Sequence, residues 1–315
     1  MNINNFLEKY IYLNIKISAF LKEIKIIRNN NYFTLIKNNK KLIVKKKELT
    51  WKNPLTIKNN FDKINVEYKN LNQAISLFDK LFSYSISKTE IDLTKDFEIS
   101  FFGKTITTDF EQFKEIEYGI LGYNKYYKLR VGDIVFDLGG YHGLYSIWAS
   151  SIVGPNGKIY CFEPDKDNLE ILNKNIKENN IRNIIVEPVA VSNKTGETRF
   201  FKRGHGSRIV SSDFKTNTKD ALITIPTIRL SDYIRNNNIQ KIDFIKADIE
   251  GEEIEFVDDY LKNLLPGGIK PKMAIASYHY RKDLSTNTSK QIAKKFKKNG
   301  IKVNIGNKKH LCVFV

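Results

Sequence analysis

From Gly132 to the end of the 315-residue chain, segments with strand patterns and segments with helix patterns alternate. This alternation is typical of α/β proteins, in which helices cover both faces of a parallel sheet. The segments with strand character are 134–138, 158–162, 183–189, 242–247, 273–277, 302–305 and 310–315. A short loop joins the last two, so we expect an antiparallel pair at one edge of the sheet.

Helical patterns lie between these strands. A helix is predicted to begin at Leu144, and the segment 165–180 places leucine and isoleucine at spacings of three and four, which gives one face toward the core. A further predicted helix, 254–264, is followed by a proline and two glycines that end it. The last predicted helix includes 292–296 and ends at Gly300.

Residues 1–110 precede this alternation, and we expect them to form a smaller α+β region beside a larger domain at 111–315. Residues 5–27 mix apolar and charged side chains at helical spacing. They predict an amphipathic helix that packs on its own domain or on a second subunit, as in a homodimer, with peripheral membrane contact as the alternative. The remaining patterns in this part predict hairpins at 32–46 and 97–110 and a helix over 110–129.

The segment 195–232 interrupts the alternation of the larger domain. Strand-like ends flank a polar middle, which predicts an inserted hairpin lying over the carboxyl ends of the sheet strands. Loops at that edge of a parallel sheet usually build the active site. Glycines and arginines surround His205, Ser207 and Arg208, so we predict that these three residues contact an acceptor with hydroxyl or phosphate groups.

The chain is basic, with a formal net charge of +17, and residues 1–60 contain 13 Lys and Arg against 3 Asp and Glu, a net charge of +10. We attribute this excess to a compositional bias on solvated faces, with an anionic membrane surface or a polyanionic partner as alternatives. No apolar run approaches the ~18 residues of a membrane span, and the N-terminal stretch lacks the order of a secretory signal, so we expect a cytoplasmic protein. Two cysteines, Cys161 and Cys312, predict neither a disulfide framework nor a cysteine metal site.

The stretch Val135–Gly143 (VFDLGGYHG) joins an apolar strand to a glycine-rich turn. Such a turn brings main-chain N–H groups close to a nucleotide-like cofactor. The dinucleotide fingerprint G-x-G-x-x-G is not matched, because Tyr141 and Leu144 stand at its second and third glycine positions. Asp137 supplies a carboxylate for a cationic amine, and Glu163, after the next strand, can accept hydrogen bonds from both ribose hydroxyls. A dehydrogenase or a methyltransferase could carry this pair.

Four motifs together resemble the FkbM family of S-adenosylmethionine-dependent methyltransferases: VFDLGGYHG, CFEPD, VAVSNKTGE and FIKADIEGEE. The resemblance covers roughly residues 115–315. It implies a Rossmann-like class I methyltransferase fold with a seven-stranded sheet, S-adenosylmethionine as the cofactor, and methyl transfer to an oxygen of a sugar or glycosylated product. The cofactor-binding residues that it implies in the first three motifs are Asp137, Gly139, Gly140, Tyr141, Gly143, Glu163, Pro164 and Ala190.

A hydroxyl acceptor must lose its proton during methyl transfer, which calls for a positioned base. Asp248 and Glu250 follow the strand expected at the centre of the sheet, and His279 follows another strand at the same edge, next to Tyr278, a predicted substrate contact. We predict catalytic roles for these two acids and His279, with Asp248 or His279 as the base. The acids could also position a substrate, bind a divalent cation or stabilise the next helix start. We predict no metal site, since no histidine pair has helical ligand spacing.

The leading hypothesis is an O-methyltransferase that acts on a glycan, a glycolipid or a related small molecule. An RNA methyltransferase that holds its substrate with the basic residues 1–60 is the alternative enzyme. Against it, the N-terminal region shows no recognisable RNA-binding signature, and the acids in 248–253 would repel phosphate, so nucleic acid is not the expected partner. The non-enzymatic alternative is a cofactor-binding protein whose N-terminal region docks to a membrane or to a partner.

Overall fold

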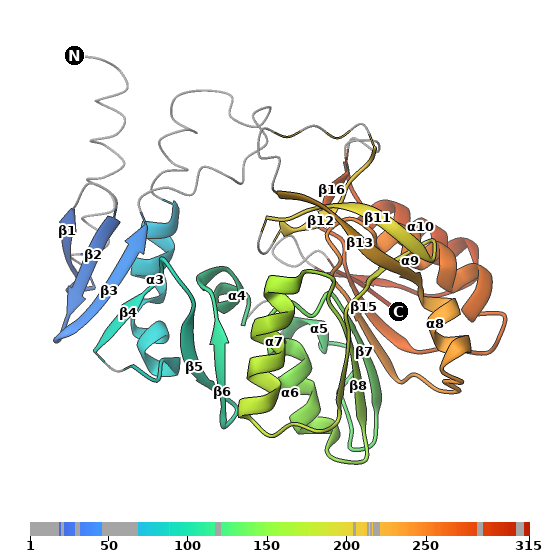
Figure 1. The fold of residues 1–315 in the computed structure, drawn as a ribbon, viewed down its shortest axis with the longest axis horizontal. Coiled ribbons are helices and arrows are strands. Elements are labelled where there is room, and N and C mark those ends of the chain that lie inside the picture. The colour runs from blue at the N-terminus through green and yellow to red at the C-terminus, as the bar shows by residue number, and fades with distance from the viewer. Residues whose placement is uncertain are drawn as a thin grey trace. The chain divides into compact units, whose positions relative to one another are not determined.

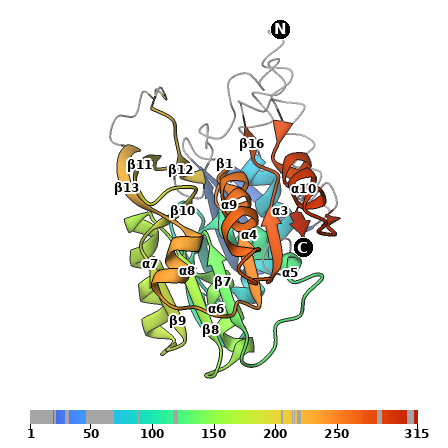
Figure 2. The same ribbon diagram turned by 90° about the vertical axis from the view of Figure 1, so that its right-hand side faces the viewer.

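The structure of the chain is a computed structural model (Figures 1 and 2). It describes residues 19, 22–28, 32–45, 69–87, 89–116, 121–203, 206–212, 214, 216, 221–281, 286–306 and 312–315. The chain divides into two compact units, Met1–Phe110 and Glu111–Val315. Within the described residues, no helix combines the length and the apolar character that a membrane crossing requires.

The smaller unit contains a four-stranded sheet, with strand order β1-β2-β3-β4, and a separate hairpin of β5 and β6. Alternate apolar residues of β2 and β3 are buried, and α3 packs against β3. The elements of this unit are β1 Lys25–Arg28, β2 Tyr32–Lys37, β3 Lys40–Lys45, α3 Lys69–Tyr84, β4 Glu90–Asp92, β5 Phe97–Phe101 and β6 Lys104–Thr108.

Both hairpins predicted in this unit are confirmed. The β2–β3 turn has positive φ at Asn38 and Asn39, 48° and 61°, as a two-residue type I′ turn requires. The predicted helix over 5–27 is wrong at its end, because Lys25–Arg28 is strand β1 and pairs with β2. The β-branched Ile26 and Ile27 favour an extended chain once a partner strand lies alongside. Apart from Ala19 and residues 22–24, the rest of that predicted helix lies outside the described residues, and α3 was not predicted.

The larger unit is built on a seven-stranded sheet with strand order β18-β19-β15-β14-β7-β8-β9. The pairs from β15 to β9 are parallel, whereas β19 runs antiparallel to β15 and to β18. This confirms the predicted mostly parallel sheet with an antiparallel edge. Its elements are β7 Ile134–Leu138, α6 Leu144–Val153, β8 Lys158–Phe162, α7 Lys166–Glu178, β9 Ile184–Glu187, α8 Leu230–Asn236, β14 Phe244–Ala247, α9 Glu253–Asp259, the π-helix η5 Tyr260–Leu264, β15 Lys272–Ala276, α10 Ser289–Lys298, β18 Asn304–Ile305 and β19 Cys312–Phe314.

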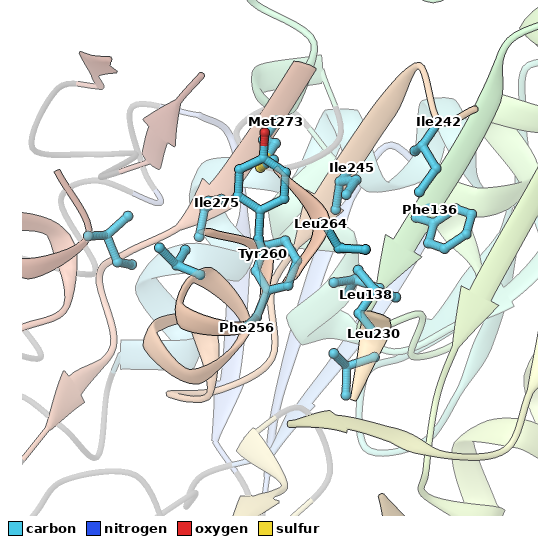
Figure 3. Packing of buried hydrophobic residues seen from close by; sticks show 14 of the residues in the cluster. Phe136, Leu138, Leu230, Ile242, Ile245, Phe256, Tyr260, Leu264, Met273 and Ile275 are labelled. Carbon is cyan, nitrogen blue, oxygen red and sulfur yellow. The ribbon is translucent and has the colours of Figure 1, made fainter. Parts of the chain in front are cut away.

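Helices cover both faces of this sheet. Figure 1 shows α6 and α7 on one face and α8, α9 and α10 on the other, and the turned view in Figure 2 agrees. Successive strand residues point to opposite faces. Phe136, Ile245 and Met273 therefore share one face of the sheet and belong to the buried cluster of Figure 3, which also includes Phe256 and Tyr260.

The strand register brings two charged residues together on the opposite face. β7 and β14 run parallel, and Asp137 is the direct partner of Lys246 in their register. Both side chains point to the α6 face, where Ser146 of α6 lies over Asp137 and donates a hydrogen bond to it. A buried ion pair inside an otherwise apolar sheet follows from this register.

The segment that interrupts the alternation forms a second, four-stranded sheet with order β10-β13-β11-β12. The predicted hairpin strands are confirmed as β11 Gly196–Phe201 and β13 Leu222–Arg229, which pair antiparallel. The structure adds β10 Ala190–Ser192, which pairs parallel with β13, and β12 Arg208–Ile209. The end of the segment was not predicted to be helical, but it begins α8.

Within the predicted helix over 110–129, the described residues form α4 Phe110–Glu115 and α5 Leu121–Tyr123, and residues 124–129 are not helical. After α5 the chain turns, with Asn124 Nδ2 donating to the carbonyl oxygen of Tyr127. The Tyr127 ring then stacks on Phe244 of β14, with ring centroids 5.5 Å apart. Packing on the sheet therefore overrides the helical periodicity of this stretch.

Candidate cofactor and acceptor site

A cleft opens where the second sheet meets the carboxyl ends of the central strands. The empty space in and around it, open solvent at its mouth included, is about 940 Å³. The lining residues come from the glycine turn after β7, the end of β8, the second sheet and the turn after β14: they include Gly139, Gly140, Tyr141, Glu163, Pro164, Asn168, Ala190, Phe200, Ser207, Arg208, Lys246, Asp248, Glu250 and Glu252.

The glycine turn lines the cleft, but its glycines are required by packing within the chain. Gly139 has φ 87°, and a Cβ there would overlap the main-chain carbonyl of Asp248. A Cβ on Gly140 would overlap Cys161 Sγ, and one on Gly143 would overlap Leu172. We predicted these glycines because a cofactor could then approach the main chain closely. That reason is incomplete, because Gly139 also allows the turn after β7 to contact the end of β14. Gly143 does not line the cleft.

Glu163 lies at the end of β8 with its side chain buried and held by three donors. Its Oε2 accepts the Tyr141 N–H at 2.8 Å, and its Oε1 accepts the Asp165 N–H at 2.9 Å and Asn168 Nδ2 at 3.2 Å. Burial raises the pKa of Glu163 to about 7, although these three donors lower it. The carboxylate therefore stands at the cleft wall, fixed in orientation and ready to accept hydrogen bonds from a ligand diol.

Asp137 is fully buried and does not line the cleft, contrary to its predicted contact with the cofactor's amine. Lys246 already supplies the cation, with Nζ 2.9 Å from Asp137 Oδ1 and 2.6 Å from the Gly139 carbonyl oxygen. Lys246 itself lines the cleft. Lys246 was not among the predicted site residues, although a lysine inside the apolar strand FIKA was a signal, because a charge is rarely buried without a partner.

Asp248 stands at the carboxyl end of β14, the central strand of the seven, as predicted. Tyr123 donates its hydroxyl to Asp248 Oδ2 at 2.7 Å, and Tyr278 donates to Oδ2 at 3.0 Å. These two tyrosines orient the carboxylate at the cleft wall. Tyr278, a predicted substrate residue, does not line the cleft, and its hydroxyl is bonded to Asp248 instead.

His279 lies among three carboxylates, and its side chain is 10% exposed. Its Nδ1 is 2.8 Å from Glu253 Oε1, and its Nε2 is 3.4 Å from both Asp248 Oδ1 and Glu250 Oε1. Burial alone lowers the pKa of His279, but Glu253 and Glu250 raise it, and the net pKa is well above the usual 6.5. A raised pKa disfavours the neutral ring that a general base requires, so it argues against His279 as the base, and the catalytic role of His279 stays a prediction.

A tight turn carries Glu250 into this cluster. Glu250 has φ 53° and Gly251 has φ 113°, and Glu253 is fully buried beneath them. Glu253 Oε1 accepts the Ile249 N–H at 3.1 Å, and its Oε2 accepts the Gly251 N–H at 3.1 Å. A left-handed non-glycine residue of this kind persists only where surrounding bonds hold it.

The structure places most of the remaining predicted residues at the cleft wall. Ser207, Arg208, Pro164 and Ala190 line it, and the Arg208 guanidinium lies over the Phe201 ring at 5.8 Å. His205 lies outside the described residues.

Several residues of the cleft wall were not predicted. Tyr145 and Asn168 follow the predicted motifs closely in sequence, but their patterns are those of ordinary core and helix residues. The unpredicted residues of the wall are Gln112, Tyr123, Tyr145, Phe162, Asn168, Val189, Val191, Phe200, Ile209, Lys246, Ile249 and Glu252.

The fold and the cleft together define a class of protein. A seven-stranded, mostly parallel sheet with an antiparallel edge carries a glycine turn after β7 and an acid at the end of β8, at the carboxyl edge where α/β folds bind nucleotide-like ligands. These are the features of class I methyltransferases that use S-adenosylmethionine. A family model described as the methyltransferase FkbM domain matches residues 137–303, more than half of the chain. The chain therefore belongs to the FkbM methyltransferase family, and the predicted resemblance is confirmed.

Solved structures show similarity at low identity. A methyltransferase FkbM from Methylobacillus flagellatus KT is 19% identical, with a TM-score of 0.38, and the match covers 58% of this chain and 43% of that one. A fibrillarin from Aeropyrum pernix, in complex with natively bound S-adenosyl-L-methionine, is 11% identical over 92% of this chain and 97% of that chain, with a TM-score of 0.39. Identities this low say nothing about the acceptor. A comparison with curated proteins finds no match.

Proposed function

We propose that the protein is an S-adenosylmethionine-dependent O-methyltransferase that acts on a hydroxyl of a glycan, a glycolipid or a related small molecule. The observation that carries this proposal is the cleft itself, because one cavity joins the Glu163 carboxylate and the glycine turn to the Asp248 and Glu250 carboxylates. A nucleoside at one end and an acceptor at the other would share that cavity. We further propose that this function belongs to Glu111–Val315 and that Met1–Phe110 is an accessory region.

The residues present fit the proposed cofactor. Glu163 offers two fixed oxygens to a ribose diol, and the main chain at Gly139 and Gly140 gives room beside it. Lys246 presents a cation at the cleft wall that can meet the cofactor's carboxylate. When bound, the cofactor supplies an electrophilic methyl group on a sulfonium centre. The protein contributes chiefly by holding the acceptor oxygen in line with that centre.

The acceptor hydroxyl must lose its proton as the new bond forms, and we propose Asp248 as the group that receives it. Asp248 lines the cleft, and Tyr123 and Tyr278 fix the direction of its oxygens. Glu250, which also lines the cleft, can accept a hydrogen bond from a second hydroxyl of the substrate. His279, whose Nε2 lies 3.4 Å from both carboxylates, would act as a positioning residue for them.

The lining of the cleft supports a hydroxylated acceptor over RNA. Asp248, Glu250 and Glu252 all line the cleft from the turn after β14, and carboxylates accept hydrogen bonds from sugar hydroxyls but repel phosphate. Arg208 of the second sheet also lines the cleft. Its positive charge can bind an anionic substituent on the acceptor.

Methyl transfer from isotope-labelled S-adenosylmethionine tests the proposal. The full chain is incubated with labelled cofactor and, in separate reactions, with oligosaccharides, glycolipids and RNA, and the products are analysed by mass spectrometry. We expect label in a hydroxyl of a glycan-type acceptor, and loss of at least ~100-fold in turnover for Asp248→Asn with cofactor binding retained. Label in RNA alone, with binding that weakens steeply as salt rises, would replace the glycan proposal by the nucleic-acid alternative.

A further inference from the structure

At the cleft wall, Asp248 and Glu250, together with His279, bring one ligand atom each to within 4.8 Å of one another. The geometry points to a divalent cation site, formed by these three side chains, that takes Mn²⁺. We predicted no metal site from the sequence, because the histidines show no ligand spacing; the three residues meet only through the sheet.

The His279 ring gives an independent reason to place a ligand here. Its Nε2 is buried and makes no hydrogen bond, and its neighbours Asp248 Oδ1 and Glu250 Oε1 are each 3.4 Å away, at ion-pair distance only. A buried ring nitrogen without a hydrogen bond is costly. Ligand atoms 3.4 Å apart are too far for a good hydrogen bond but suit two ligands of one cation with bonds of about 2.1 Å.

Glu253 prepares the histidine for this role. Its Oε1 lies 2.8 Å from His279 Nδ1, so with an ion bound the Nδ1 proton would be donated to Glu253 and the Nε2 lone pair would be left for the ion. Histidines that bind metals almost always donate their other ring N–H in this way. Glu253 is fully buried and also accepts the N–H groups of Ile249 and Gly251, so one carboxylate fixes both the ring and the turn that carries Glu250.

The local charge favours a cation. Asp248, Glu250 and Glu253 surround one imidazole, and the nearby Lys246 forms an ion pair with Asp137. A divalent ion would offset the two carboxylates that face Nε2 and would leave the histidine neutral. One imidazole with two carboxylates suits Mn²⁺, since carboxylates favour Mg²⁺ and Mn²⁺ whereas imidazole favours transition metals.

The position of the site gives the ion a role in the proposed reaction. Asp248 and Glu250 line the cleft, so the remaining coordination positions would face the acceptor. A hydroxyl bound to the ion would have a lowered pKa and a fixed orientation. This role rests on the proposed methyl transfer, whereas the ion site itself does not.

Binding of Mn²⁺ to the full chain tests the inference. Free Mn²⁺ is measured by electron paramagnetic resonance as protein is titrated, and S-adenosylhomocysteine binding is measured by calorimetry on the same samples. We expect one Mn²⁺ per chain, with affinity at least ~10-fold weaker in His279→Ala and in Glu250→Gln, and about 10-fold to 100-fold weaker in Glu253→Gln. Asp258→Asn, which removes an exposed acid paired with Lys295, is the matched control and should bind normally.

The two binding measurements separate the possible failures. If S-adenosylhomocysteine binds but Mn²⁺ does not at millimolar concentration, the cation site is refuted, the cluster is an ion network around a charged histidine, and the proposed function stands. If Mn²⁺ binds but S-adenosylhomocysteine does not, the proposed function fails and the site remains. Mn²⁺ affinity unchanged in both His279→Ala and Glu250→Gln would also refute the assignment.

Discussion

Replacing Glu163 by glutamine should remove a pH dependence from both stability and cofactor binding. In the folded protein, burial raises the pKa of Glu163 from 4.5 to about 7. The folded state therefore holds a proton that the unfolded state releases between these values. The stabilising contribution of that proton is fully present below pH 4.5 and is lost as the pH rises through about 7.

The magnitude follows from the two pKa values. Between pH 5 and pH 8 the linkage relation removes about 2.5 kcal/mol from the free energy of unfolding of the wild-type protein, and this part of the change should be absent in Glu163→Gln. Glutamine still faces the donors of Tyr141, Asp165 and Asn168 and cannot accept from all of them. The lost hydrogen bonds lower the free energy of unfolding of Glu163→Gln by the same amount at every pH. The quantity to compare is therefore the slope of the free energy of unfolding against pH.

Ligand binding should move in the opposite direction. If the ionised carboxylate accepts the ribose hydroxyls, S-adenosylhomocysteine should bind about tenfold more tightly at pH 8 than at pH 6, because the ionised fraction of Glu163 rises from about one in eleven to about ten in eleven. Urea unfolding and calorimetry across this range measure both effects. Titration of the ligand's own amine is common to the wild type and Glu163→Gln. Equal pH slopes in the two proteins would refute the reasoning.

Two further predictions concern the support of the cleft. Lys246→Met should lower the free energy of unfolding by about 3 to 5 kcal/mol, because it leaves Asp137 buried without its cation. Adding Asp137→Asn should restore part of this loss, as measured by urea unfolding. If the double variant restores nothing, the charge argument is contradicted. Gly139→Ala should lower the free energy of unfolding by about 2 to 4 kcal/mol and abolish S-adenosylhomocysteine binding, since the new Cβ would overlap the Asp248 carbonyl at a residue with positive φ. Gly267→Ala is the control and should change little, because its Cβ would make only ordinary contacts. Equal effects in the two variants would count against this account.

Local patterns were sufficient for the architecture of the larger unit. Strand and helix periodicities in the chain predicted the parallel sheet and its antiparallel edge, and Asp248 was correctly placed after the central strand. The helix predictions were wrong at residues 25–27 and 124–129, because each stretch has helical periodicity but a neighbouring strand or a stacked ring holds it in another conformation. Such contacts are non-local and leave little trace in a short window of sequence.

The sequence by itself determined which residue types could build a site: glycines in a turn after a strand, an acid after the next strand, and two acids after the central one. Only the tertiary structure decided how they are used. Asp137 meets Lys246 because their strands are adjacent and in register, and Glu253 reaches His279 because the turn after β14 folds back beside the end of β15. Register and strand order depend on the packing of the whole sheet, so the charges that face one another across it cannot be read from spacing along the chain.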